Sequence, residues 1–146
     1  MREELKMTPE QEDAIITHLL LNVLCIVRDG SFNERLELGT AAWVMAIGRE
    51  IFGIGQHMTP GEGSLQCSHR SKLSGILGAI LQMNDLCMKH KVESGRVELR
   101  CDGLGAVEIV RNIHDTINPN RKHFDIITSI KEALQYSPLI WTFAPR

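Results

Sequence analysis

The sequence predicts an α/β domain: a mixed sheet of five strands flanked by helices, in the order β-β-β-α-β-α-β, with an extra helix at the N-terminus. The run from Val23 to Val27 is continuously apolar, which is typical of a strand covered on both faces. Short connections link it to two more strand-like segments, which favours an antiparallel meander. Strand-like and helical segments then alternate, which predicts crossovers that add parallel strands.

The first half of the chain supplies the extra helix and the meander. Thr8, Pro9 and Gln11 have the spacing of a capped helix start, and we expect a helix through about His18. The first strand runs from Val23 into the segment Arg28-Asp29-Gly30-Ser31-Phe32. Residues 39–47 and 51–56 are the second and third strands, separated by a turn at residues 48–50.

The second half predicts the crossovers. Residues 59–64 have the composition of a loop, and a long helix begins near Ser68. Its apolar stripe contains Gly75 and Gly78, which predicts close packing against the sheet. Further segments follow in the order strand, helix, helix, strand, over residues 97–101, 104–113, 124–135 and 139–143.

Length and composition indicate a single globular domain. The chain has 146 residues, of which 43% are hydrophobic and 23% charged. We expect a helical extension over residues 1–21 and the main domain over residues 22–146.

The net charge of −2 argues against nucleic-acid binding by bulk charge alone. The four cysteines lack CxxC spacing, which argues against a zinc ribbon. No signal peptide or membrane-length apolar run is seen, so we expect an intracellular protein without a membrane partner.

Two aspartates follow apolar strands and precede glycine. Asp29 ends the first predicted strand and Asp102 ends the fourth. Asp-Gly is also a common turn signal, and each residue alone is explained by a turn. In the predicted topology, however, these strands are parallel neighbours, so both carboxylates lie at one edge of the sheet. Such a pair suits Mg²⁺, which prefers oxygen ligands.

Four segments, in this order, resemble ribonuclease H-like domains of non-LTR-type retrotransposon reverse transcriptase polyproteins. The match covers roughly residues 22 to 143. The first segment is Asp29 to Phe32 together with Gly39 to Val44, and the other three are Ser68 to Ile76, Cys101 to Ala106, and Ile140-Trp141. The resemblance implies a ribonuclease H-like fold and metal-dependent hydrolysis of the RNA strand in RNA–DNA hybrids. It also implies Mg²⁺ or Mn²⁺ as the cofactor, RNA–DNA hybrid or RNA as the partner, and a place in a longer reverse transcriptase polyprotein.

The resemblance also implies the site residues. Asp29 and Asp102 take the positions of two catalytic, metal-binding acids, and Lys72 stands where the family has a glutamate. Contacts to the substrate are implied for Gly30, Ser31, Arg70 and Gly103. The family's fourth acid and last helix follow the fifth strand, beyond Arg146, so we expect a domain truncated at its C-terminal end.

Lys72 weakens the expected metal site by charge. An ammonium about 4 Å from a divalent cation repels it by about 8 kcal/mol at an effective dielectric constant of about 20. Lys72 could instead pair with Asp29 or Asp102, or extend into solvent.

Three functions remain open. The first is a ribonuclease H-like domain with impaired cleavage. The second is a non-catalytic module that binds RNA or hybrids through shape, phosphates and 2′-hydroxyls. The third is a small α/β interaction domain with no role in nucleic-acid biology. We expect His114 and His123 to lie on a polar connection, which is a solvated loop or, as the alternative, a surface that faces nucleic acid.

Overall fold

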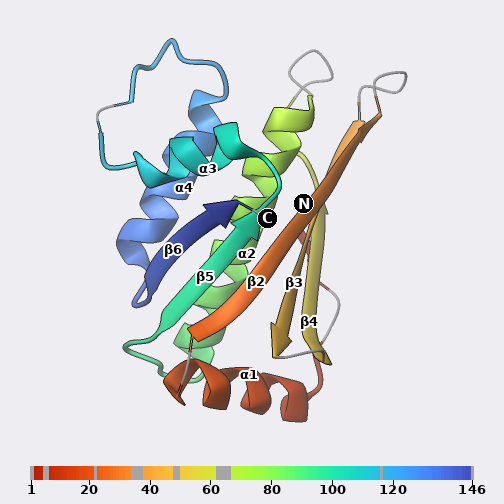
Figure 1. Ribbon diagram of the computed structural model, residues 1–146, viewed down its shortest axis with the longest axis vertical. Helices are drawn as coiled ribbons and strands as arrows, with labels where there is room; N and C mark the ends of the chain where they lie inside the picture. Colours follow the sequence, from red (N-terminus) through yellow and green to blue (C-terminus); the bar gives the residue numbers. More distant parts are fainter. Residues whose placement is uncertain are drawn as a thin grey trace.

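A mixed β-sheet forms the centre of the structure (Figure 1). The computed structural model describes residues 2–4, 7–21, 23–33, 38–47, 50–61, 67–115 and 117–145, and within some strands it describes the backbone alone. In this part of the chain the strands are β1 (Arg2–Glu4), β2 (Val23–Asn33), β3 (Leu38–Ile47), β4 (Glu50–Met58), β5 (Arg96–Cys101) and β6 (Ile140–Pro145).

The order of the strands confirms the predicted α/β topology. Across the sheet they lie in the order β1-β4-β3-β2-β5-β6. Strands β2, β3 and β4 form the antiparallel meander, whereas β5 pairs in parallel with both β2 and β6. The central β2 and β5 are therefore parallel neighbours, as their sequence order predicted.

The predicted number of strands was wrong by one. Residues Arg2–Glu4 add β1 at the edge of the sheet, in antiparallel pairing with β4 and in the register Glu3 to Gln56. This segment is three charged residues long and has no alternation of apolar and polar residues. Backbone hydrogen bonds to an existing edge decide its conformation, and these leave no pattern in the sequence.

Four helices pack around the sheet in the described residues: α1 (Pro9–Leu21), α2 (Ser68–Lys89), α3 (Leu104–Arg111) and α4 (Phe124–Tyr136). In Figure 1, α2 lies behind the sheet with α4 beside it, α1 crosses the lower end, and α3 begins where β5 ends. Both Gly75 and Gly78 of α2 are buried, in accord with the predicted close packing. Of the helices that the structure describes, none is long and apolar enough to cross a lipid bilayer.

The capping box predicted for α1 is present. The backbone N–H of Thr8 donates to Oε1 of Gln11 at 2.9 Å, and the N–H of Gln11 donates to Oγ1 of Thr8 at 3.2 Å. The helix runs on to Leu21, and its Ile15 and Leu19 belong to the same hydrophobic core as the sheet. The Lys89 ammonium, 2.9 Å from Glu12, joins α1 to the end of α2.

The core lies between the sheet and α2. Its largest fully buried side chain is Trp43 of β3, whose indole N–H donates to Oε1 of Gln82 on α2. Gly55 of β4 lies directly over this ring: a Cβ there would be 2.1 Å from the indole. Glycine is required at residue 55 because the tryptophan already fills the space of a side chain.

Candidate functional site

The predicted site lies where β5 ends beside the middle of β2. The prediction that Asp29 ends its strand was wrong, because pairing with β3 continues β2 to Asn33. The two strands pair in parallel, with Arg28 in register with Cys101. Asp29 and Asp102 each come one residue later, and α3 begins two residues after Asp102. The backbone therefore places the two aspartates close together. For Asp29, Gly30 and Ser31 only the backbone is described, so their predicted contacts to metal or substrate lie outside the described side chains.

Asp102 forms an ion pair with an arginine that the sequence analysis did not single out. The guanidinium Nη2 of Arg28 donates to Oδ1 of Asp102. The Arg28 side chain is fully buried, while that of Asp102 is 45% exposed. Burial raises the pKa of the Asp102 carboxyl, but the charge and hydrogen bond of Arg28, with a smaller effect from Lys72, bring it below its ordinary value. Asp102 is therefore an ionised carboxylate that already has a cation.

Two nitrogens of the Arg28 guanidinium make no described hydrogen bond. Its Nε and Nη1 are buried, and neither has a hydrogen-bond partner among the described residues. A buried guanidinium with donors that have no described partner is costly, so the ion pair to Asp102 is important for keeping it in place. A sequence signal for this residue did exist: Arg28 is in phase with Leu24 and Ile26, both fully buried, in a strand whose side chains alternate.

Lys72 lies next to Asp102 in space. It comes from the first turns of α2, and its stem packs against the backbone at Gly103. A Cβ on Gly103 would be 2.7 Å from Cδ of Lys72 and 3.4 Å from Nζ. The side chain is partly buried. The structure thus brings together Lys72 of α2, Asp102 and Gly103 between β5 and α3, and Arg28 from the middle of β2.

These residues do not fit a divalent metal ion. Mg²⁺ and Mn²⁺ bind oxygen ligands that are free to coordinate, usually from more than one carboxylate. Here one oxygen of Asp102 is held by Arg28, and the Lys72 ammonium lies beside it. The described residues also contain no group of three or more His, Cys, Asp or Glu side chains placed to hold a metal. The charge that a metal would bring is already supplied by the side chains.

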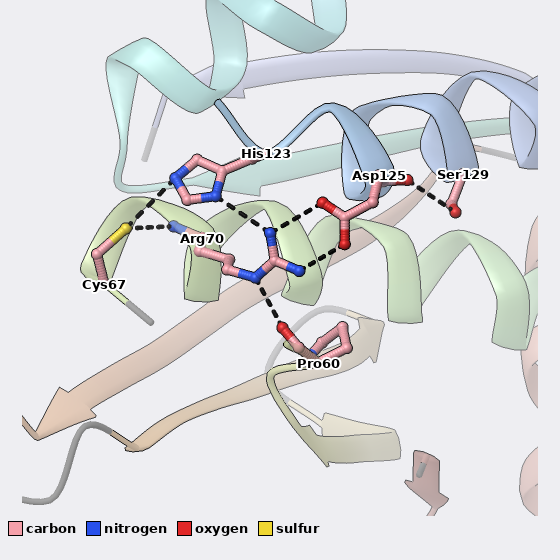
Figure 2. A network of polar contacts seen from close by, with 6 residues as sticks. All are labelled: Pro60, Cys67, Arg70, His123, Asp125 and Ser129. Carbon is pink, nitrogen blue, oxygen red and sulfur yellow. Dashed lines mark hydrogen bonds and ion pairs between the residues drawn. The ribbon is translucent and has the colours of Figure 1, made fainter. Parts of the chain in front are cut away.

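Arg70 is placed differently from the substrate contact that we expected. Its side chain is fully buried and faces the start of α4 (Figure 2). Its Nη1 and Nη2 donate to the two carboxylate oxygens of Asp125, at 3.0 and 2.6 Å, and its Nε donates to the Pro60 carbonyl at 2.7 Å. This fork-like pairing fixes the guanidinium. Arg70 thus joins α2 to α4 and to the segment after β4, because a planar group with several donors satisfies all three neighbours.

His123 completes this network, and the prediction that it lies on a solvated connection was wrong. Its side chain is buried, with Nδ1 3.2 Å from Nη1 of Arg70 and Nε2 3.5 Å from Sγ of Cys67. Since arginine always donates, Nδ1 accepts and Nε2 carries the proton toward the sulfur. Burial, and then the charge of Arg70, lowers the pKa of His123 to about 4. His123 therefore cannot serve as a base for Cys67, because its facing nitrogen is already protonated.

Two ribonucleases are similar to the chain in three dimensions. Ribonuclease H1 from the halophilic archaeon Halobacterium salinarum NRC-1 has a TM-score of 0.57 at 14% sequence identity, and the match covers 86% of each chain. LC11-RNase H1, isolated from compost by a metagenomic approach, has a TM-score of 0.59 at 17% identity, again over 86% of each chain. No protein-family model and no curated protein sequence matches the chain.

These similarities bear on the fold alone, since both identities are low. The predicted ribonuclease H-like sheet is confirmed by its strand order and by both structures. The chain has the ribonuclease H fold.

Proposed function

We propose that this domain acts on RNA–DNA hybrids or RNA, and that its metal-dependent cleavage is impaired. The ion pair between Arg28 and Asp102 is the observation that carries the second half of this proposal. Arg28 already holds one oxygen of Asp102 and neutralises its charge, so a metal ion would gain less from this carboxylate and would compete with Arg28 for it. Removing the partner of a buried charge typically costs about 3–5 kcal/mol, and metal binding would have to overcome a share of this cost.

Action on RNA–DNA hybrids or RNA is supported by the fold and by the sequence motifs together. The two similar structures are ribonucleases H1, and four segments of the chain resemble retrotransposon ribonuclease H domains in the right order. We propose on the same basis that the domain derives from a retroelement and works as part of a longer reverse transcriptase polyprotein. Fold similarity alone would not justify this step, because one fold serves many functions.

Of the alternatives, the non-catalytic binding module gains most from the structure. Binding to RNA or a hybrid requires cationic groups near the phosphate backbone and no metal. Lys72 supplies positive charge at the site where a cleaving enzyme needs free carboxylates, and Arg28 neutralises the negative charge of Asp102 there. A chain that binds hybrids and does not cut them is therefore the strongest form of the proposal.

The test measures binding and cleavage on the same substrate. A hybrid with a labelled RNA strand is incubated with the protein in Mg²⁺, in Mn²⁺ and in a chelator. We expect binding that weakens as salt rises, unchanged by the chelator, with little or no cleavage. Robust cleavage that disappears in Asp102→Asn would refute the impaired site. Absence of any salt-dependent binding would favour the interaction domain without a nucleic-acid role.

A further inference from the structure

The N-terminus of α3 presents unused hydrogen-bond donors beside Asp102. The first N–H groups of a helix have no acceptor within the helix and carry a partial positive charge. Here the N-cap is Gly103, in an extended conformation (φ −106°, ψ 104°), and it provides no side-chain cap. Neither Gly103 nor Gly105 has a side chain, so a ligand can approach the backbone of the first turn closely.

Lys72 places an ammonium over this helix start. Its Nζ would be 3.4 Å from a Cβ on Gly103, and it makes no ion pair with any described side chain. Its stem packs on Gly103, the residue directly before the amides of Leu104 and Gly105. The two kinds of donor, an ammonium and backbone amides, thus converge from α2 and α3.

Arg28 is an independent sign that an anion belongs here. It is a fully buried cation whose Nε and Nη1 have no described partner, and its Nη2 holds Asp102, the residue before the N-cap. Arg28 and Asp102 neutralise each other, and Lys72 brings a positive charge to the same place. The α3 terminus adds about half a charge of the same sign. The Arg28–Asp102 pair neutralises the acid that would otherwise repel an anion.

We propose that this site binds a phosphate group directly, without a metal ion. The Lys72 ammonium and the amides of Leu104 and Gly105 would donate to its oxygens, and Arg28 would keep Asp102 neutralised beneath it. Next to Gly105 lies a cavity of about 550 Å³ whose lining includes His69, Glu108, Asn112 and Arg121. It provides space for an organic group attached to the phosphate. The phosphate of a nucleic-acid backbone and free phosphate share this chemistry; only the former rests on the proposed function.

The test is a titration of the ¹⁵N-labelled chain with inorganic phosphate, at constant ionic strength and in a chelator. We expect saturable shifts of the Leu104 and Gly105 amide signals. Lys72→Met keeps the packing of the stem and removes the charge, and it should weaken binding about ten-fold, as expected for loss of one charge-assisted hydrogen bond. Lys91→Met removes the same charge beyond the far end of α2. It should change affinity by less than about two-fold, since exposed charges beyond the Debye length of about 8 Å are screened.

The variant Gly103→Ala tests the position of the Lys72 ammonium without changing its charge. Its Cβ would displace Cδ of Lys72, which is cheap for the fold because the side chain is flexible, but it moves the ammonium. We expect weaker phosphate binding with an unchanged net charge. Absence of saturable shifts in the wild-type chain, or an equal loss of affinity in Lys72→Met and Lys91→Met, would overturn the proposed site.

A second titration uses a single-stranded thymidine oligonucleotide without a terminal phosphate. Tighter binding of the oligonucleotide than of phosphate, lost in Lys72→Met, assigns the site to a nucleic-acid backbone. Tighter binding of free phosphate assigns it to a small ligand and leaves the phosphate site intact. Salt-dependent binding of hybrids without any shift at Leu104 or Gly105 would retain the proposed function and reject this site.

Discussion

The buried network around Arg70 leads to a sharp prediction about stability. Both carboxylate oxygens of Asp125 accept hydrogen bonds from Arg70, which is fully buried, and the Asp125 side chain is 63% exposed. Truncation in Asp125→Ala leaves the guanidinium with only the Pro60 carbonyl and His123 as described partners. A buried charge would then be only partly compensated, so we expect a clear loss of stability.

The magnitude follows from the two contacts and the exposure of Asp125. Hydrogen bonds to charged groups contribute about 1.5–3 kcal/mol each, and exposure of the carboxylate screens part of this energy. Loss of an acidic residue from the first turn of α4 adds about 0.5 kcal/mol. We therefore expect Asp125→Ala to lower the free energy of unfolding by about 2.5 kcal/mol, and the melting temperature by about 8 °C in a domain of this size.

Urea denaturation followed by circular dichroism measures this change. Glu132→Ala is the matched control: it truncates another exposed acid of α4 that makes no described ion pair, and it should change stability by less than about 0.5 kcal/mol. A loss in Asp125→Ala no larger than in this control would refute the reasoning, because the pair would then behave as an ordinary surface ion pair.

Three further predictions concern acid, packing and metal. The pKa of His123 is lowered to about 4 by burial and by Arg70, so the unfolded chain binds more protons below its ordinary pKa of about 6.5. Stability should therefore fall by up to about 3 kcal/mol as the pH drops from about 6.5 to 4, and an equally steep fall in His123→Gln would assign the effect to other groups. Gly55→Ala forces a Cβ to 2.1 Å from the Trp43 ring and should cost about 3 kcal/mol or more. In contrast, Gly105→Ala meets only His69 at 3.7 Å and should stabilise α3 by up to about 1 kcal/mol, so thermal melts showing equal effects would contradict the packing. Finally, Lys72→Glu alone should gain less Mg²⁺ affinity by calorimetry than Lys72→Glu with Arg28→Leu, because Arg28 still holds Asp102; equal gains would show that Arg28 does not compete with the metal.

The strand and helix pattern was largely predictable from the chain itself. The apolar run at residues 23–27, the capping residues Thr8 and Gln11 and the helical stripe after Ser68 each act through local preferences that the sequence carries. The short strand β1 escaped prediction because pairing to β4, and no local preference, makes it a strand. The approach of Asp29 to Asp102 followed from the predicted parallel pairing of β2 with β5, whereas the continuation of β2 past Asp29 to Asn33 was missed, because it depends on pairing with β3.

The partners of the charged side chains were less predictable. Arg70 and His123 are 53 positions apart in sequence and meet only because α2 and α4 pack together. The antiparallel meander of β2, β3 and β4, the parallel pairing of β2 with β5 and the presence of Lys72 where a glutamate was expected were determined by the sequence alone. Only the tertiary structure decided that Arg28, buried between sheet and helix, neutralises Asp102. A buried charge is costly unless an opposite charge lies next to it. Which residue provides that charge is known only when the chain has folded.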